Sequence, residues 1–236
     1  MKFEDVQLSV VMPVYNEERW VREVVRRVRQ VPLAKELIVV DDGSTDGTRA
    51  ILRELEAECP DLRLLLLPCN RGKGAALRAG FRQATGDVVV VQDADLEYDP
   101  ADYPTLLQPI LEGRADVVYG SRLAGGGRRG LGPGQYLANR VLTWLSNRLT
   151  GLRLTDMETG SKAFRREVLA GLALESDRFG FEPEITAKVA RKRGPAWRVC
   201  EVPIRYAGRS YAEGKKIGVK DAFSALWCIV RFRYLG

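Results

Sequence analysis

A dense group of carboxylates directly follows a run of valines near the middle of the chain. The valines occupy residues 88–91, and Asp93, Asp95, Glu97 and Asp99 come within a few positions of them. Carboxylates this close together repel one another unless a positive charge lies among them. If the strand continues to this point, Asp93 and Asp95 lie on the same side of it. Two carboxylates on one side, in a chain without histidine, suit a hard cation such as Mg²⁺ or Mn²⁺.

Two more polar groups follow strand-like runs. The segment "VVDDGSTDGT" at 39–48 places Asp42 where its carboxylate could accept hydrogen bonds from a nucleobase or from ribose hydroxyls. Asp42 could equally begin a turn, and Asp46 could cap the helix that follows. The segment "MPVYNEE" at 12–18 brings Glu17 to the end of another run, where it could also serve as an acid in the first turn of a helix.

The elements that must position these residues alternate regularly in the first half. Apolar runs predict strands at 8–14, 35–42, 62–67, 87–95 and 115–122, and apolar spacing predicts helices at 17–31, 44–58, 74–85 and 101–112. Continuous apolar strands alternating with helices predict an α/β fold, a mostly parallel sheet with helices on both faces. Ligands bind beyond the carboxyl ends of such strands, and each acidic group comes at one of those ends.

The second half is less regular. A glycine-rich segment at 123–134 precedes predicted helices at 136–149, 181–193 and 217–233, and a predicted strand at 196–206. The polar, basic stretch at 207–216 is interpreted as a lid. Neither repeats nor an interdomain linker divide the chain, so we expect one domain over residues 1–236.

Taken together, the motifs resemble a known family. "PVYNE" (13–17), "VDDGSTDGT" (40–48), "NRGKGAAL" (70–77), "QDADLE" (92–97), "YGSR" (119–122), "LTDMETGSKAFRR" (154–166), "GFEPEI" (180–185) and "RSYAEGKKIG" (209–218) follow one another as in the family 2 glycosyltransferases with the GT-A fold. Within that family the pattern is most similar to the polyprenyl- or dolichyl-phosphate hexose synthases, which include the mannose synthases. The resemblance implies a nucleotide-sugar-binding half at 1–122 and an acceptor-binding half at 123–236.

The resemblance also implies roles for individual residues. The nucleotide sugar is expected to contact Pro13, Tyr15, Glu17, Val40, Asp42, Asp93, Ala94, Asp95, Arg209 and Lys215. The metal is expected to bind Asp93, Asp95 and Glu97, and Arg122 is expected to face the reacting phosphates. The arginine and serine that hold the lipid phosphate in mannose synthases have no clear counterpart, so Asn139 and Arg140 are taken as their substitutes beside Arg122.

The implied reaction is an inverting, metal-dependent transfer of a hexose from GDP-mannose or a UDP-hexose to a polyprenyl phosphate. A bound cation with arginine and lysine would stabilise the nucleoside diphosphate as it leaves. A phosphate acceptor is already ionised near neutral pH and needs no general base. A hydroxyl acceptor, on a glycolipid or a soluble substrate, would need one. Asp156 is then the first candidate and a third catalytic residue beside Asp95 and Arg122, and Glu182 and Glu184 follow it. Helix capping, or salt bridges with Lys162 and Arg165, are the alternative roles of these three carboxylates.

Other classes of function fit the sequence less well. A sugar nucleotidyltransferase would need a glycine-rich N-terminal loop, which residues 12–18 do not provide. A non-catalytic basic binding module leaves the acidic strand ends unexplained, and no stacking-aromatic motif for nucleic acid is present. The four scattered cysteines predict neither a zinc site nor disulfides.

The charge is unevenly distributed along the chain. Residues 1–118 hold 15 basic and 21 acidic residues, and residues 119–236 hold 22 and 10, so the halves carry −6 and +12. The basic half suggests an anionic partner. Because no run is apolar for long enough to span a bilayer, we expect a cytoplasmic protein, peripheral on the inner membrane face or attached to a membrane-embedded partner. The stretch 222–234 suits either a membrane surface or the protein core.

Overall fold

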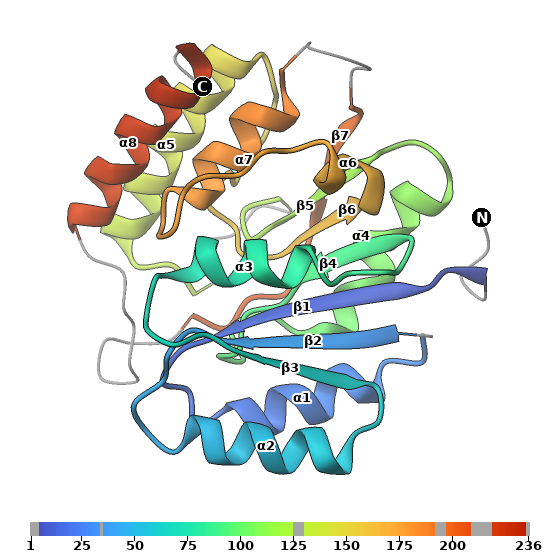
Figure 1. Ribbon diagram of the computed structural model, residues 1–236. Coiled ribbons are helices and arrows are strands. Elements are labelled where there is room, and N and C mark those ends of the chain that lie inside the picture. Colours follow the sequence, from blue (N-terminus) through green and yellow to red (C-terminus); the bar gives the residue numbers. More distant parts are fainter. Residues whose placement is uncertain (1–4, 34, 125–129, 192–196, 209–218, 235–236) are drawn as a thin grey trace.

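A single seven-stranded sheet organises the chain (Figure 1). The computed structural model describes every residue except 1–4, 34, 125–129, 192–196, 209–218 and 235–236. The strands, in the order in which they lie in the sheet, are β3 (Leu62–Leu66), β2 (Lys35–Asp41), β1 (Leu8–Val14), β4 (Val88–Val91), β6 (Lys162–Arg165), β5 (Val117–Ser121) and β7 (Val199–Pro203). The predicted α/β architecture is confirmed.

The sheet is parallel except at β6. Strand β6 pairs antiparallel with β4 on one side and with β5 on the other, and the remaining pairs are parallel. The carboxyl ends of β1, β2, β4 and β5 therefore meet at one edge, on the left in Figure 1. The residues that follow these strands form the candidate site.

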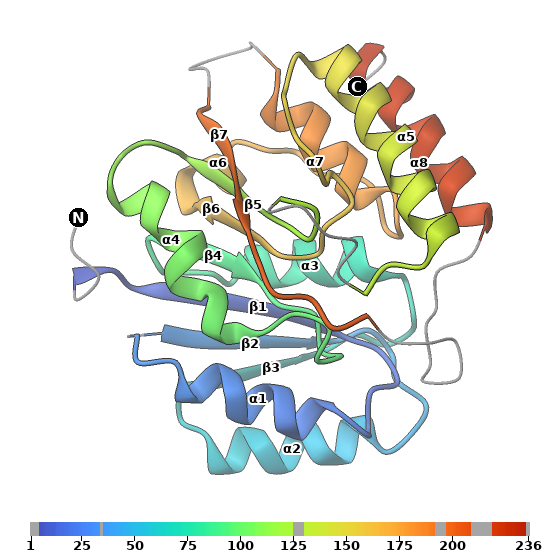
Figure 2. The ribbon, with the colours of Figure 1, turned by 180° about the vertical axis from the view of Figure 1, so that it is seen from behind.

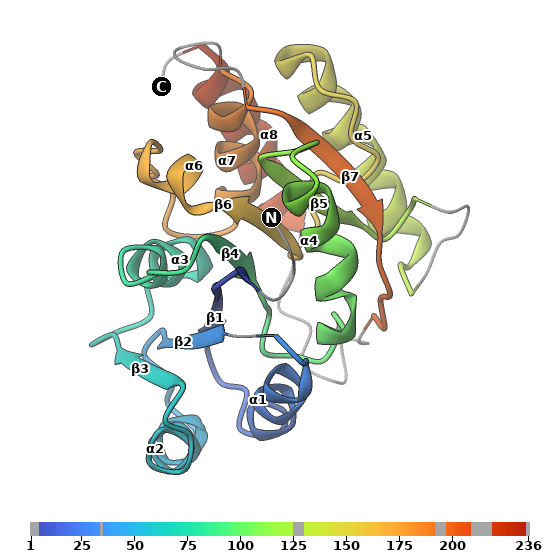
Figure 3. The same ribbon diagram turned by 90° about the vertical axis from the view of Figure 1, so that its right-hand side faces the viewer.

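Helices cover both faces of the sheet. The face of α1 (Val21–Gln30), α2 (Thr48–Glu58) and α4 (Tyr103–Leu111), with the short 3₁₀ helix η2 (Pro100–Asp102), holds one core cluster. The opposite face holds a second, with α3 (Lys73–Phe81), α5 (Pro133–Thr150), α6 (Arg166–Ala170), α7 (Phe181–Val189) and α8 (Val219–Tyr234). Figure 3 shows α1 and α4 on one side of the sheet and α3 and α6 on the other.

The alternation of side chains along the strands explains this two-faced core. Val10 and Val90 lie in the first cluster, whereas their neighbours Val11 and Val91 lie in the second. Strands buried on both faces read as continuous apolar runs, and each fully buried valine contributes about 1.5–3 kcal/mol. On α1, the buried stripe of valines at the predicted spacing leaves the arginines of that helix on the outside.

Three helices of the second half form a layer beyond the sheet. Helix α8 contacts both α5 and α7, and α5 also contacts α7. Figures 1 and 2 show α5 and α8 side by side at the outer edge of the molecule. Within the described residues, no helix is both long enough and apolar enough to cross a bilayer.

Candidate active site

The loops that follow β1 and β2 hold each other in place. The backbone N–H of Asn16 donates to Ser44 Oγ at 2.9 Å, and that of Glu17 donates to Thr48 Oγ1 at 2.9 Å. Asp46 accepts from the backbone N–H of Thr48, the first residue of α2, at 3.0 Å, although Gly47 is the N-cap of that helix. Glu17 is 9 % exposed, and Pro13 and Tyr15 are partly exposed beside it at the edge of the sheet.

Asp42 is fixed by the loop that precedes α3. Its two carboxylate oxygens accept from the backbone N–H groups of Arg71 at 2.9 Å and of Gly72 at 2.6 Å. Two backbone donors orient the carboxylate at the carboxyl end of β2 without placing a side-chain cation on it. Val40 is different, because it is fully buried in the second core cluster. The Val40 side chain therefore faces the core, and the predicted contact between this residue and a nucleotide stays a prediction.

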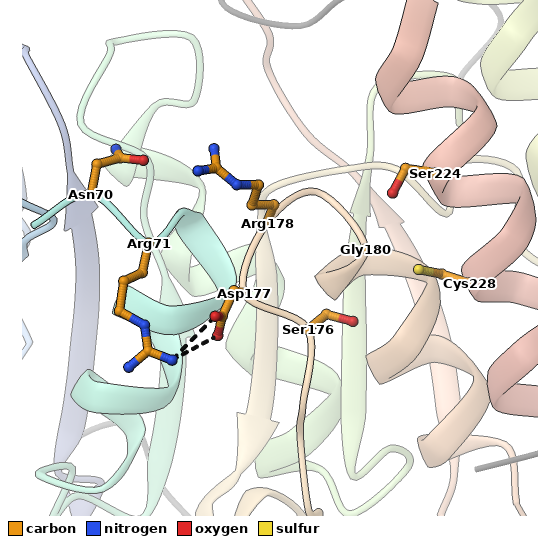
Figure 4. Close-up of a pocket in the computed structure, with 8 residues that line it drawn as sticks. All are labelled: Asn70, Arg71, Ser176, Asp177, Arg178, Gly180, Ser224 and Cys228. Carbon is orange, nitrogen blue, oxygen red and sulfur yellow. Dashed lines mark hydrogen bonds and ion pairs between the residues drawn. The ribbon is translucent and has the colours of Figure 1, made fainter.

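A pocket of about 470 Å³ opens beside the same loop (Figure 4). It is lined by Asn70, Arg71, Ser176, Asp177, Arg178, Gly180, Ser224 and Cys228. Arg71 pairs with Asp177 at 3.1 Å across its floor. Of the predicted active-site residues that the structure describes, none lines this pocket, so the candidate site is defined by the strand ends and not by this cavity.

The acidic residues after β4 lie in a turn. Strand β4 ends at Val91, so the expectation that strand alternation aligns Asp93 with Asp95 is wrong. Gln92 organises the turn, because its amide donates to the backbone oxygens of Asp93 at 3.0 Å and of Tyr98 at 3.2 Å. Leu96 has a φ of 60°, a left-handed conformation that β-strands do not contain. The turn brings the backbone N–H of Glu97 to 3.2 Å from Asp95 Oδ1.

Lys73 places a positive charge beside these carboxylates and so reduces the repulsion among them. Lys73, the first residue of α3, lies 2.8 Å from Asp93 Oδ1 and 3.3 Å from Glu182 Oε1. Glu182 in turn pairs with the fully buried Lys162, which begins β6. Burial opposes the charge on Lys73, but Asp93 and Glu182 outweigh it, and the pKa of Lys73 is raised. Charges of alternating sign therefore run from the acidic turn into the protein.

The acidic turn offers the right donors for a divalent cation, although it does not enclose one. No three acidic or cysteine side chains are grouped to hold a metal in the part of the chain that the structure describes. Glu97 accepts from the Tyr206 hydroxyl at 2.8 Å and so faces a different partner from Asp93. Mg²⁺ commonly uses one or two carboxylates and completes its shell with water and substrate phosphates. Asp93, which accepts from Lys73, and Asp95 stay the predicted ligands for such a cation.

A second cluster forms around Arg122 at the end of β5. Its guanidinium pairs with both carboxylate oxygens of Asp156, with Nε and Nη2 each at 2.7 Å. The amide of Asn139, on α5, donates to Asp156 Oδ1 at 2.7 Å. The Arg122 guanidinium also lies 5.1 Å from the centre of the Tyr206 ring. The structure thus brings three predicted site residues together, with Tyr206 as an addition.

The protonation state of Asp156 decides whether it can act as the predicted base. Burial opposes its ionised form, but the Arg122 charge and the hydrogen bonds outweigh it, and the pKa of Asp156 lies below its usual value. A general base works best with a pKa near the working pH, so this carboxylate is poorly suited to the task. Glu182 is paired with two lysines, and Glu184 accepts from Lys188 at 2.6 Å. The candidates for a base are therefore held in ion pairs.

The two clusters meet at Tyr98 and Tyr206. Their rings lie 5.3 Å apart, and the two residues form an isolated antiparallel bridge. The backbone N–H of Gly160 donates to the Tyr98 hydroxyl at 2.8 Å, and a side chain at Gly160 would collide with Asp93. The segment after Asp156 therefore packs directly on the acidic turn. Arg140 is exposed on α5, and Arg209 and Lys215 lie outside the described residues.

Glu158 has an unusual environment between the clusters. The residue as a whole is partly buried, but its Oε1 oxygen is buried and has no hydrogen-bond partner. Burial and the nearby Glu182 raise the pKa of Glu158 to about 7, against the opposing charges of Lys162 and Arg122. Because the pKa in the folded chain exceeds the usual 4.5, the folded chain holds this proton more tightly than the unfolded chain does, and stability is lost as the pH rises from 4.5 to about 7.

Glu158→Gln is therefore expected to make the chain more stable above neutral pH, by on the order of 1–3 kcal/mol. The wild type should lose stability between the usual carboxyl pKa of 4.5 and about 7, and the variant should not. Urea unfolding across this pH range measures the difference. Glu167→Gln, on the exposed side of α6, controls for loss of a carboxylate in general. Parallel pH profiles for wild type and Glu158→Gln would contradict the assignment.

Sequence reasoning missed Lys73 as a partner of the acidic turn. Lys73 belongs to the "NRGKGAAL" motif, and α3 begins at Lys73, one residue before the predicted helix at 74–85, after Gly72 with a φ of 108°. A cation in the first turn of a helix opposes the helix dipole, and this could have indicated a nearby anion. The predicted salt bridge to Lys162 is confirmed for Glu182, although the two residues are distant in sequence.

Comparisons with known proteins agree with this geometry. Residues 9–172 match the family described as Glycosyl transferase family 2. The chain is 32% identical to an undecaprenyl-phosphate mannosyltransferase of Micrococcus luteus, over 90% of this chain and 88% of that protein. It is 30% identical to a dodecaprenyl-phosphate galacturonate synthase of Rhizobium johnstonii, over 94% of this chain but only 65% of that longer protein.

The fold is also shared with solved structures of glucosyl-3-phosphoglycerate synthase from Mycobacterium tuberculosis. The complex with Mg²⁺ and UDP matches with a TM-score of 0.73 and 25% identity, over 97% of this chain and 79% of that one. The complex with Mn²⁺, UDP and phosphoglyceric acid matches with the same TM-score and 22% identity, over 98% and 80%. The fold is thus that of the GT-A glycosyltransferases, and the chain belongs to glycosyl transferase family 2.

Proposed function

We propose that the chain transfers a hexose from a nucleotide sugar to a polyprenyl phosphate, with inversion at the anomeric carbon. The polyprenyl-phosphate transferases among its relatives support this acceptor class. GDP-mannose and the UDP-hexoses are the candidate donors. The reaction would take place at the cytosolic face of a membrane, where a lipid phosphate is presented to a protein that has nucleotide sugars on the same side.

The observation that carries the proposal is the Arg122–Asp156 pair. A buried guanidinium fixed by a bidentate carboxylate is a preorganised site for an anionic group, since three of its five N–H donors remain for other acceptors. A phosphate acceptor needs such a cation and no base. A hydroxyl acceptor needs a base, and Asp156, Glu182 and Glu184 are all held in ion pairs. The hydroxyl alternative is therefore less favoured.

Each predicted site residue has a proposed role in this reaction. Pro13, Tyr15, Glu17 and Asp42 would bind the nucleoside at the ends of β1 and β2. An acceptor phosphate oxygen beside Arg122 would attack the anomeric carbon as its bond to the nucleoside diphosphate breaks. Asp93 and Asp95 would hold a divalent cation that neutralises the charge growing on this diphosphate. Asn139 would position Arg122 through Asp156, and Arg209 and Lys215 would supply further cations from the predicted lid.

A panel of nucleotides tests the donor half of this proposal. We expect the thermal midpoint to rise with either UDP or GDP and its sugars, and the rise to depend on Mn²⁺ or Mg²⁺, because a ligand that binds only the folded chain stabilises it. ADP and CMP are the controls. Equal midpoints across the whole panel, with and without metal, would contradict nucleotide-sugar binding. Transfer of radiolabelled hexose to a short-chain polyprenyl phosphate, and not to the corresponding polyprenol, tests the acceptor.

A further inference from the structure

Exposed large hydrophobic side chains are concentrated on two helices. Among the described residues they are Leu66, Leu137, Val141, Trp144, Leu226, Trp227 and Val230. All but Leu66 belong to α5 or α8, which lie side by side at the outer edge of the molecule (Figures 1 and 2). We call the six residues on these helices the α5–α8 surface. Single exposed apolar residues need no explanation, but a group on adjacent elements marks an interaction site.

Helix α5 has one exposed apolar face and one buried polar face. Leu137, Val141 and Trp144 are 65 %, 53 % and 66 % exposed, and their spacing places them in one stripe along the helix. Asn139 and Thr143 are buried on the opposite side. Thr143 donates to Asn139 Oδ1 at 3.1 Å and so helps to hold the residue that contacts Asp156. The inner face supports the candidate site, and the outer face is apolar without covering any core.

Helix α8 shows the same division. Ala225, Ile229 and Phe232 are buried against the second half of the core. Trp227 is 60 % exposed and Val230 is 38 % exposed on the other side. The sequence left open whether this stretch packs in the core or lies on a membrane. The structure shows that one face of α8 packs in the core and that the opposite face is exposed to solvent.

The charges around this surface are mostly positive, with Asp221 in the first turn of α8 and Glu175 beside Arg231 as acidic residues near it. No aspartate or glutamate occurs between Arg122 and Asp156, a stretch that contains all of α5, and none occurs in residues 222–236. Arg140 and Arg148 are exposed on α5. On α8, Arg231 and Arg233 lie at the two edges of the apolar stripe, where Arg231 pairs with Glu175 at 3.1 Å and Arg233 Nε donates to the backbone oxygen of Leu149 at 2.6 Å. Arginines at the rim of an apolar face can extend their guanidinium groups to lipid phosphates.

We infer that the α5–α8 surface docks the chain on the surface of an anionic bilayer. Tryptophan is favoured at the membrane–water interface, and basic residues are attracted to anionic lipid. A symmetric dimer through the same face would bring two sets of arginines together, which disfavours a second copy as the occupant. Helices that lie in the interface plane carry this combination of an apolar stripe with basic edges.

Docking in this way would present the candidate site to a lipid. The surface and Asn139 are on opposite sides of α5, so they are separated by one helix diameter, about 10 Å. This part of the inference rests on the proposed lipid-phosphate acceptor. Arg122, Asp156 and Asn139 would then lie close to the bilayer surface, at the depth where the phosphate of a polyprenyl chain is found.

Co-sedimentation of the ligand-free protein with vesicles tests the surface. We expect binding to vesicles rich in phosphatidylglycerol at low salt, weaker binding as NaCl is added, and much weaker binding to phosphatidylcholine alone. Trp144→Ser with Trp227→Ser should lower the partition coefficient at least about tenfold, equivalent to about 1.4 kcal/mol. Arg140→Gln with Arg148→Gln should reduce the dependence on salt. Leu66→Ser removes an exposed apolar side chain from β3 and should bind like the wild type.

Three results would overturn the inference. They are no binding by the wild type at low salt, equal binding by the tryptophan variant, and a wild-type dimer in sedimentation velocity that Trp144→Ser dissociates. Circular dichroism of the variants establishes that they are folded. Nucleotide stabilisation without vesicles reports separately on the proposed function. A chain that binds nucleotide sugars but no vesicles contradicts only the docking surface, and a chain that binds vesicles but no nucleotide contradicts only the proposed reaction.

Discussion

Asp95→Asn is expected to lower the rate of hexose transfer on the order of 10²–10³-fold while leaving the fold unchanged. The substitution keeps the shape of the side chain and its hydrogen bond from the backbone of Glu97, which an amide oxygen can also accept. It removes the negative charge that a divalent cation requires. The same variant should therefore lose the metal-dependent part of its thermal stabilisation by nucleotide, a measurement independent of turnover.

Asp99→Asn is the matched control for this prediction. Asp99 belongs to the same acidic group, but it caps η2 by accepting from the backbone of Ala101 at 3.0 Å and lies 3.3 Å from Arg205. Its loss should cost at most about 1 kcal/mol of stability and little activity. If Asp95→Asn kept its metal-dependent nucleotide binding, or if the two variants lost activity equally, the assignment of Asp95 to the metal would be wrong.

Arg122→Met is expected to destabilise the chain by roughly 3–5 kcal/mol, because it leaves the buried carboxylate of Asp156 without its cation. The side chain of Asp156 is fully buried, and that of Arg122 is 10% exposed. Adding Asp156→Asn to this variant removes the stranded charge and should restore part of the lost stability. Urea unfolding of the wild type, both single variants and the double variant gives the coupling energy. Additive effects would mean that the two side chains do not form the pair.

The pH dependence of this difference has a defined sign. The pKa of Asp156 is depressed in the folded chain, so the stability it contributes is present above its usual value of 3.8 and is lost as the pH falls through the lower, folded value. The gap in stability between wild type and Arg122→Met should therefore shrink in acid. The variant is also expected to lose transfer activity, because Arg122 is the group proposed to face the acceptor phosphate.

The parts of the fold with strong local patterns could be predicted from the sequence. The valine run of β4 and the spaced valines of α1 specify a buried strand and an amphipathic helix without reference to the rest of the chain. Because the sheet is parallel, the positions of Asp42 and Asp93 after their strands were enough to place both at one edge. The resemblance to the family added Arg122, the need of a hydroxyl acceptor for a base added Asp156, and Asn139 was a substitute for missing family residues. The structure joins these three by hydrogen bonds.

The parts that could not be predicted depend on contacts between distant segments. Strand β6 has only four residues, and the first of them, Lys162, is charged although it is fully buried. The sequence therefore contains no apolar run that predicts this strand. Lys162 is tolerated there because Glu182 and the backbone oxygen of Thr159 accept from it. The partner of Asp93 was not predicted either, because Asp93 lies in the turn after β4 and Lys73 reaches it from the start of α3. Partners of buried charges are set by the tertiary structure and not by local sequence.

The antiparallel strand also determines when this protein can fold during translation. Strands β4 and β5 do not touch each other, because β6 lies between them. When residues 1–122 have left the ribosome, strands β1 to β4 can pair with one another. Strand β5 is then separate from them, because its neighbours β6 and β7 have not yet been made. Strand β6 joins β4 to β5 only after Arg165 has been made, and β7 covers the free edge of β5 only after Pro203 has been made. A nascent polypeptide of this kind exposes unpaired strand edges for several seconds at ordinary rates of synthesis, which makes it a natural client for chaperones that shield such edges.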